Sequence, residues 1–208
     1  LSKTEAAEAN RDQLAGLDGN FIAQTFRGKS KSSLTGCNCG HSSTTEEEFM
    51  ALVVNLRESG DRCSLRDCIQ DMFEAERPEG IRCNGCQGVD TCQKQFGMVR
   101  LPPVLTVQLG RFRQLDDGTR VKITTPVDYD LELDSRELMQ DVQQHRRYRL
   151  AAVVNHYGQT LESGHYKAIC FNQARGGWYE FNDHVVTAVR DSDVQSAAAY
   201  MLFYTAEE

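Results

Sequence analysis

The chain carries one histidine in a setting that suits acid–base chemistry. His165 lies at the start of residues 164–171, a run in which apolar side chains alternate, and a second β-rich run, residues 178–181, ends at Asn182 and Asp183. A glycine pair between two such runs is typical of a hairpin, which would bring the start of the first run close to the end of the second. A histidine whose second ring nitrogen is held by an amide or a carboxylate makes up two-thirds of a nucleophilic triad.

The other histidines are weaker candidates for this chemistry, and a surface hairpin with a solvated histidine would show the same spacing. The chain has five histidines; we expect His145, in a charged stretch, to be solvated, and His184 directly follows the polar turn. His156 and His165 therefore compete as the general base. We favour His165 because a base must be held rigidly, and this residue begins a strand whereas His156 begins a glycine-flanked loop.

Most of the eight cysteines lie in the first half of the chain, where they suit either disulfide bonds or a metal site. Cys83 and Cys86 have the spacing of a zinc knuckle, and Cys37 and Cys39 form a second, shorter pair. Tetrahedral zinc takes two ligands from each of two turns, so we predict a site made by these four cysteines, with His41 as an alternative ligand. A chain of this length needs no disulfide staples, which favours a reducing compartment and structural zinc. Free buried cysteines are the other interpretation.

One segment has the pattern of an amphipathic helix. Residues 64–77 carry apolar side chains at i, i+3, i+4, i+7 and i+8, which places them on one helical face. Ser64 with an acidic residue three positions later is close to a capping box, and Pro78 should end the helix. Before it, residues 1–20 read as a polar lead-in.

Several β-rich runs should form the sheet that holds the histidine. Residues 104–109 alternate between apolar and polar side chains, residues 127–133 repeat that alternation, and residues 148–155 form a third run. We expect all three to be strands. The loop 156–164 then leads directly into His165.

Composition and charge narrow the class of partner. The 208 residues include 40% hydrophobic and 25% charged ones, which is ordinary for a globular domain. The 30 acidic and 23 basic residues give a net charge of −7, which argues against nucleic acid and anionic membranes and suits a basic peptide better. No apolar run approaches the roughly 18 residues that span a bilayer, and the polar start has no signal peptide. We therefore expect an intracellular protein whose start has been trimmed.

Three blocks of the sequence resemble the ubiquitin-specific proteases, a family of papain-like cysteine proteases. The segment GHYKAICF…GGWYEFNDHVV, with the closing AAAYMLFYTAE, is similar to the His box of that family. The Phe26-x-Gly28 turn and the cysteine pair after it resemble the family's entry to its fingers. The run CQKQFGMVRLPPVLTVQLGRF resembles the family's passage from the second cysteine knuckle to a core strand.

This resemblance covers about residues 20–206 and implies a fold. The class is α+β, a papain-like cysteine protease fold of the ubiquitin-specific protease type, with a mixed or antiparallel palm sheet and zinc-ribbon-like fingers. The N-terminal thumb part of that fold would be missing. Residues 21–208 would be a partial catalytic domain, with fingers at about 35–100 and the palm at about 101–206.

The resemblance also implies a function. The protein would be a deubiquitinating cysteine protease that hydrolyses (iso)peptide bonds after the C-terminal glycine of ubiquitin. His165 would be the base, Asn182 would orient its ring, and Asp183 would support the same histidine. We rank Asn182 first because a carboxamide fixes the tautomer without adding charge. The loop 156–164 would line the channel for the ubiquitin tail, with Glu162 facing it.

The nucleophile is not evident in the chain. The family's catalytic cysteine should precede the fingers, yet residues 1–35 contain no cysteine. Cys63 lies at a helix start that would lower the pKa of its thiol, but the family places that helix away from the site. Cys170 reads as a buried strand residue. We therefore expect the nucleophile outside these residues, so that this piece alone would be inactive.

Two other functions stay open. If the natural chain lacks the nucleophile, the protein would be a catalytically inactive ubiquitin-binding or scaffold module of the same fold, although the presence of His165, Asn182 and Asp183 together argues against this. A plain zinc-ribbon interaction module would leave the histidine segment unexplained. The expected partners are ubiquitin and ubiquitinated proteins in the cytoplasm or nucleus, without nucleic acid or membrane.

Overall fold

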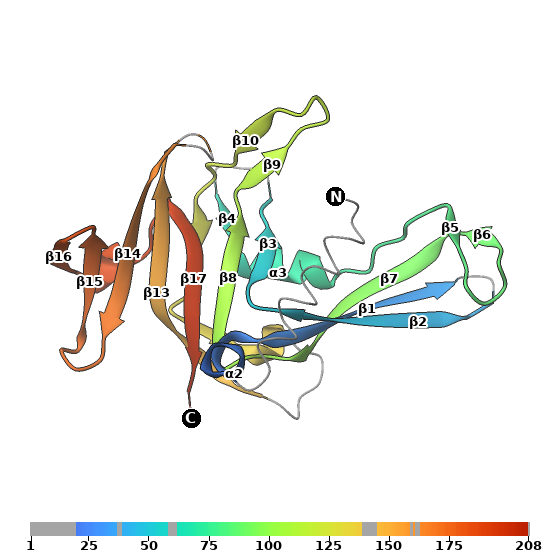
Figure 1. The fold of residues 1–208 in the computed structure, drawn as a ribbon, viewed down its shortest axis with the longest axis horizontal. Coiled ribbons are helices and arrows are strands. Elements are labelled where there is room, and N and C mark those ends of the chain that lie inside the picture. The colour runs from blue at the N-terminus through green and yellow to red at the C-terminus, as the bar shows by residue number, and fades with distance from the viewer. Residues whose placement is uncertain are drawn as a thin grey trace.

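The computed structural model describes residues 20–36, 39–57, 62–138, 145–158, 160 and 163–207. These residues form a large mixed β-sheet and a smaller sheet that extends away from it (Figure 1). In the large sheet the spatial order of strands is β16-β15-β14-β13-β17-β8-β3, and β12 pairs with β13. Within the ranges given above, no helix has the length and apolar character needed to cross a bilayer.

The large sheet is antiparallel except where β3 pairs in parallel with β8. Its strands are β3 (Leu52–Asn55), β8 (Val104–Gly110), β12 (Glu132–Asp134), β13 (Arg147–Tyr157), β14 (His165–Asn172), β15 (Gly177–Asn182), β16 (Val185–Val189) and β17 (Ala199–Ala206). Consecutive strands β13 to β16 are neighbours, because short connections favour antiparallel pairing. The predicted strands at 104–109 and 148–155 are thus confirmed.

One face of this sheet carries the hydrophobic core. Val107, Leu202 and Val153 lie side by side across β8, β17 and β13 and are completely buried. Leu105 and Leu109, two residues before and after Val107, are equally buried, as the period of two requires. Each such side chain contributes about 1.5–3 kcal/mol when it leaves water, so this face holds the sheet to the elements packed on it.

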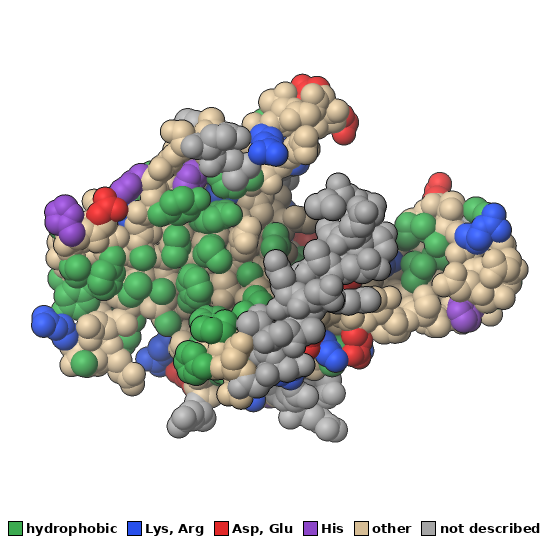
Figure 2. All heavy atoms as spheres, in the orientation of Figure 1, with side chains coloured by type: hydrophobic (Ala, Val, Ile, Leu, Met, Phe, Trp, Pro, Cys, Tyr) green, Lys and Arg blue, Asp and Glu red, His purple; other side chains and the backbone are tan. Residues whose placement is uncertain are grey.

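The opposite face is apolar but only half-buried. Val154 of β13 and Met201 and Phe203 of β17 alternate with the core residues and keep part of their surface exposed. Figure 2 shows hydrophobic side chains gathered over β13, β14 and β17. At the outer strands, Tyr166 is 50% exposed and Phe181 is 41% exposed. The sheet therefore presents an apolar surface that the described residues leave partly open.

Helix α3 (Leu65–Phe73) packs on the core face, with Leu65, Cys68 and Ile69 buried. It starts where the sequence predicts but ends four residues earlier than the predicted limit at residue 77. The reason is tertiary: the main chain of Glu76 exchanges hydrogen bonds of 2.9 and 2.8 Å with Lys94, which requires extended backbone. Ser64 precedes the helix, but its side chain makes no capping hydrogen bond, so the prediction of a capping box was wrong.

The smaller sheet has the order β2-β1-β7 and is antiparallel. Its strands are β1 (Gly28–Gly36), β2 (Ser42–Phe49) and β7 (Cys92–Arg100), and a short hairpin of β5 (Ile81–Arg82) and β6 (Val89–Asp90) lies beyond them. Figure 1 shows these strands projecting together from the large sheet. Cys39 lies in the connection between β1 and β2, and Cys83 and Cys86 lie in that between β5 and β6, so these three cysteines lie at the far end of this projection.

One expectation about local structure is corrected. The run 127–133 is not one strand but two short ones, β11 (Val127–Asp128), which pairs in parallel with β4 (Cys63–Ser64), and β12. At the start of the described chain, α2 (Phe21–Phe26) leaves Phe21 73% exposed and Ile22 47% exposed. These two apolar side chains therefore lie outside the core.

A buried arginine connects the hairpin of β9 (Phe112–Gln114) and β10 (Arg120–Lys122) to the start of β17. Arg111 is 1% exposed and donates to four main-chain carbonyls, those of Ala197, Ala199, Ile123 and Thr125, at 2.5 to 3.1 Å. Burial lowers its pKa. Because four carbonyl oxygens solvate the guanidinium, the charge is tolerated inside the fold.

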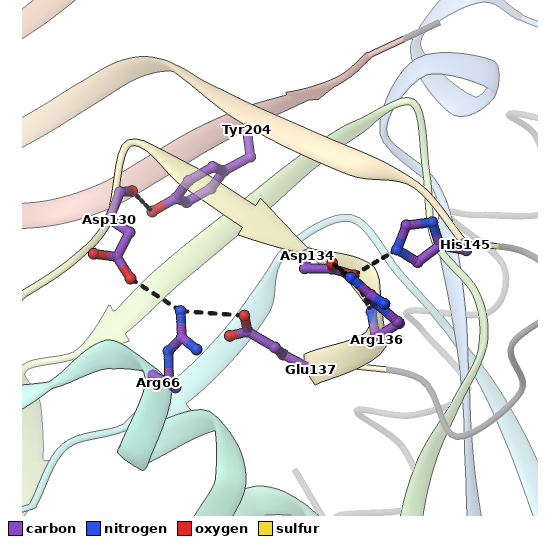
Figure 3. A network of polar contacts seen from close by, with 7 residues as sticks. All are labelled: Arg66, Asp130, Asp134, Arg136, Glu137, His145 and Tyr204. Carbon is purple, nitrogen blue, oxygen red and sulfur yellow. Dashed lines mark hydrogen bonds and ion pairs between the residues drawn. The ribbon is translucent and has the colours of Figure 1, made fainter.

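A polar network joins α3 to the chain around β12 (Figure 3). Arg66 lies 3.2 Å from carboxylate oxygens of Asp130 and Glu137, and the hydroxyl of Tyr204 donates to the carbonyl of Asp130 at 2.9 Å. These contacts fix the helix against the chain on either side of β12, the short strand that pairs with β13.

The same network includes one of the histidines. Asp134 caps the short 3-10 helix η1 (Ser135–Glu137), and the Arg136 guanidinium holds the pKa of its carboxyl well below the usual range. His145 Nε2 lies 2.8 Å from Asp134 Oδ1. His145 is exposed, as expected, and its contact with Asp134 lies among charged surface groups.

Candidate active site and metal centre

The hairpin of β14 and β15 brings His165 and Asn182 into contact. Nε2 of His165 lies 2.6 Å from Oδ1 of Asn182. The register that places Ala168 opposite Phe181 leaves the two residues at the open end of the hairpin on the same face, as diagonal neighbours. The juxtaposition that the sequence predicts is thus present, while the catalytic role of these residues remains a prediction.

This hydrogen bond decides what the imidazole can do. Carboxamide oxygen only accepts, so Nε2 must carry the proton that is shared with Asn182. In the neutral ring Nδ1 is then the unprotonated nitrogen and can accept a proton. His165 is exposed, so Nδ1 is open to a group brought in from outside the described residues. This arrangement is suited to a general base with a fixed tautomer.

Asp183 lies in the turn that follows Asn182. Together with His184 it forms a two-residue connection between β15 and β16, and its φ is +53°. Tight hairpin turns require a positive φ at their first central position, and Asp is among the few residues that tolerate it. Both turn residues are exposed. The structure therefore gives Asp183 a clear role in the turn and does not test its predicted support of His165.

His156, the competing base, is buried and packed against the chain that leads to His165. It is 1% exposed, and its Nδ1 has no partner in the part of the chain that the structure describes. Burial, with a smaller contribution from the charge of Lys122, lowers its pKa. A Cβ placed on Gly164 would lie 2.1 Å from its Nε2. This packing makes His156 a structural residue beneath the glycine before His165.

Aromatic rings surround His156, and sequence reasoning missed them. The ring centroids of Tyr166, Phe112 and Tyr200 lie 4.7, 5.5 and 6.2 Å from that of His156. Phe112 and Tyr200 also line a cavity of about 480 Å³ beside β3 and β8. These residues come from strands far apart in sequence, so no local pattern could have grouped them.

The two thiols considered above as nucleophiles, Cys63 of β4 and Cys170 of β14, are not suited to that role. Cys63 is buried, and burial raises the pKa of its thiol to about 11. Burial also raises the pKa of Cys170, which lies on the other face of β14, five residues or roughly 16 Å along the strand from His165. These two thiols are therefore poor sources of a thiolate for His165.

Three of the predicted metal ligands come together at the far end of the smaller sheet. Sulfur atoms of Cys39, Cys83 and Cys86 all lie within 4.8 Å of one another, and those of Cys39 and Cys83 are 3.4 Å apart. Tetrahedral zinc with Zn–S bonds of about 2.3 Å requires sulfur separations of about 3.8 Å, so this donor set fits zinc. Main-chain N–H groups of Cys86 and Gly85 lower the pKa of Cys83 to about 7, which favours the thiolate that a metal binds.

The fourth ligand is not settled by the contacts of the described chain. Cys37 lies outside the described residues. His41 lies close by, since a Cβ on Gly85 would come within 3.0 Å of its Nδ1, but His41 is not part of the sulfur cluster. The cluster is therefore a candidate metal centre with three cysteine ligands in place.

The fold and the site together define a papain-like cysteine protease fold of the ubiquitin-specific protease type. The sequence model of the family described as "Ubiquitin carboxyl-terminal hydrolase" matches residues 6–204. The chain therefore belongs to the ubiquitin carboxyl-terminal hydrolase family.

Curated relatives support this assignment. Human "Ubiquitin carboxyl-terminal hydrolase 2" is 37% identical over 190 residues, which are 88% of this chain and 31% of the relative. "Ubiquitin carboxyl-terminal hydrolase Usp2" of Drosophila melanogaster is 30% identical over 208 residues, 98% of this chain and 22% of the relative. The chain thus spans less than a third of the length of these two proteins.

Solved structures show the same fold. A structure of the yeast SAGA DUB module has a TM-score of 0.83 at 28% identity, covering 100% of this chain and 46% of that chain. A SAGA DUB module with Ubp8 bound to monoubiquitin has a TM-score of 0.81 at 28% identity, covering 92% of this chain and 43% of that chain. The expected α+β fold with its mixed sheet and projecting fingers is confirmed.

Proposed function

We propose that the protein to which these residues belong is a cysteine protease that hydrolyses (iso)peptide bonds after the C-terminal glycine of ubiquitin. The observation that carries this proposal is the hydrogen bond of 2.6 Å between His165 Nε2 and Asn182 Oδ1. It fixes the tautomer of an exposed imidazole, in a chain that belongs to this family. Relatives named as hydrolases of the ubiquitin carboxyl terminus support the substrate class.

The chemistry follows from the two ring nitrogens. Nδ1 of His165 accepts the proton of a cysteine thiol supplied from outside these residues, and the thiolate adds to the carbonyl carbon of the last glycine of ubiquitin. The imidazolium then returns the proton to the leaving amine as the C–N bond breaks. Water hydrolyses the thioester, again with Nδ1 as the base. Asn182 Oδ1 accepts from Nε2 throughout and so keeps the ring in place.

Other parts of the chain have supporting roles in this proposal. Asp183 holds the turn that presents Asn182 and supports the orientation of His165. Zinc, held by Cys39, Cys83 and Cys86 with Cys37 as the fourth ligand and His41 as the alternative, would join the two hairpins at the ends of the fingers. The fingers at about 35–100 and the palm at about 101–206 would bind ubiquitin, and the protein would act in the cytoplasm or nucleus. The loop 156–164 would line the channel for the ubiquitin tail; Glu162, expected to face it, lies outside the described residues.

A ubiquitin derivative with an electrophile at its C-terminus tests the proposal. The polypeptide that includes the segment upstream of residue 1 should form a covalent adduct, and the 208 residues alone should not. His165→Ala should abolish turnover of a fluorogenic ubiquitin amide while leaving the binding of ubiquitin intact. Absence of adduct and of turnover in the longer polypeptide would reject the hydrolase.

The alternative is a catalytically inactive ubiquitin-binding or scaffold module of the same fold. It predicts that the longer polypeptide binds ubiquitin without reacting with the electrophile. The tautomer-fixing contact between His165 and Asn182 is the observation against it, because a binding module gains nothing from an oriented imidazole.

A further inference from the structure

A lysine outside the candidate site contacts the main chain that leads into it. Nζ of Lys122, the last residue of β10, donates to the carbonyl of His156 at 2.9 Å and to that of Gly158 at 2.7 Å. Its stem packs near the Phe112 ring, whose centroid lies 6.0 Å from Nζ. Among the described residues, no carboxylate pairs with Lys122, so its charge is directed to these two carbonyls.

These two carbonyls need a donor because a neighbouring strand starts too late to supply one. The N–H of His156 donates to the carbonyl of Ala198. The main-chain N–H and C=O of His156 therefore face the side of β13 where β17 lies, and those of Gly158, two residues later, face the same side. β17 begins only at Ala199. The ammonium of Lys122 therefore donates to the two carbonyls that main-chain N–H groups would bind if β17 began earlier in the chain.

The segment held in this way lies directly beside His165. Tyr157, between the two carbonyls, is paired in register with His165, and His156 with Tyr166. The packing here leaves little room for adjustment: a Cβ on Gly158 would lie 2.5 Å from the carbonyl oxygen of Ser163. A Cβ on Gly164 would lie 2.1 Å from Nε2 of His156. A shift of the main chain at residues 156–158 must therefore move the main chain at residues 163–165.

We propose that Lys122 is a positioning residue for His165, holding the end of β13 so that the imidazole meets the incoming thiol in a fixed orientation. Lys122 touches neither the ring nor the substrate in this role, and it acts through the backbone. The inference rests on the proposed hydrolase function, with His165 as the base. Lys122 lies in a hairpin about 40 positions before His165 in the chain.

Three variants, made in the longer polypeptide that carries the nucleophile, test this role by turnover of a fluorogenic ubiquitin amide. Lys122→Met keeps the aliphatic stem but has no donor, and we expect kcat to fall about 10-fold with KM within 2-fold, as for the loss of one charged hydrogen bond from the support of the base. Lys122→Arg retains donors for both carbonyls and should recover most of kcat. Lys94→Met removes an exposed ion pair with Glu76 in the fingers and should leave kcat unchanged.

The outcomes separate the role of Lys122 from general destabilisation and from the hydrolase proposal. A Lys122→Met variant with kcat within 2-fold of the wild type, or an equal loss in Lys122→Arg, overturns the positioning role. If Lys122→Met does not fold, Lys122→Leu, which also has no donor, is measured in its place. If the wild type has no activity, the hydrolase proposal fails, and the nitrogen NMR signals of His165 decide about Lys122: loss of the protonated Nε2 signal in the variant supports positioning, and an unchanged spectrum rejects it.

Discussion

Replacement of Asn182 by Ala tests the contact on which the proposed function depends. Only the part of an interaction that strengthens in the transition state affects the rate. The bond of 2.6 Å to Asn182 is worth about 1 kcal/mol when the His165 ring is neutral, whereas a bond from the imidazolium is worth about 1.5–3 kcal/mol. The difference of about 0.5–2 kcal/mol predicts a fall in kcat of roughly 2- to 30-fold in Asn182→Ala.

The same change should leave substrate binding and folding nearly intact. Asn182 is half-buried and His165 is exposed, so the free energy of unfolding should change by less than about 1 kcal/mol. Asn172 gives a matched control, since it is the same residue type at the other end of the same hairpin, where its Oδ1 accepts from the N–H of Arg175 at 3.0 Å. Asn172→Ala removes a turn contact far from the imidazole and should keep kcat within 2-fold.

The assay is steady-state hydrolysis of a fluorogenic ubiquitin C-terminal amide by a polypeptide that carries the nucleophile, with kcat and KM determined separately. In a His165→Ala background, the further change Asn182→Ala should have no additional effect, because the two residues act as one unit. Full activity of Asn182→Ala, or an equal loss in Asn172→Ala, would refute the assignment of Asn182 as the residue that orients the base.

Three further predictions concern packing, metal and pH. Gly164→Ala should lower kcat more than 10-fold, because the new Cβ would lie 2.1 Å from Nε2 of His156; kcat measured beside a melting curve checks this, and an unchanged kcat would contradict the packing. Chelation of zinc, or Cys86→Ser, should lower the melting temperature by about 5 °C or more, whereas purified protein without stoichiometric zinc would argue against the metal. Burial raises the pKa of Tyr129 and of Tyr148 from 10.0 to about 12, so the folded state holds these protons more tightly than the unfolded state. Their contribution to the free energy of unfolding is complete below pH 10 and is lost between about pH 10 and 12, where that free energy should fall by about 1.4 kcal/mol per pH unit for each tyrosine. In Tyr148→Phe, denaturant titrations over this pH range should show a fall that is smaller by the contribution of one tyrosine.

The contact between His165 and Asn182 could be predicted because it lies within one hairpin. Two β-rich runs and a glycine-containing turn fix a register, and Gly176 adopts the positive φ of +65° that such a turn requires. Once the register is fixed, the ends of the two strands must meet. The sequence contains all of this information within 18 residues, from His165 to Asn182.

The end of α3 could not be predicted in the same way. The apolar stripe of residues 64–77 correctly predicts the buried face of the helix, because that periodicity is local. The helix ends at Phe73 since Glu76 pairs with Lys94 of β7, a strand about 20 residues further along. Long-range pairing overrides helix propensity at such an end.

The metal centre is an intermediate case. Spacing identifies Cys83 and Cys86 as a knuckle, but it says little about which residues complete the set. The partner cysteine, Cys39, approaches because β1 pairs with both β2 and β7, which brings two turns distant in sequence to the same end of the fingers. A short C-x-C pair leaves the choice between Cys37 and His41 to this tertiary geometry.

The lysine that supports the histidine had no signal in its own part of the sequence. Lys122 belongs to a charged hairpin that resembles any exposed turn, and its partners exist only because β17 begins at Ala199 and leaves the carbonyls of His156 and Gly158 without a strand neighbour. A carbonyl that loses its donor away from water costs about 1–3 kcal/mol. The end of β13, which lies beside His165 at the start of β14, therefore needs donors from elsewhere, and the β9–β10 hairpin supplies one.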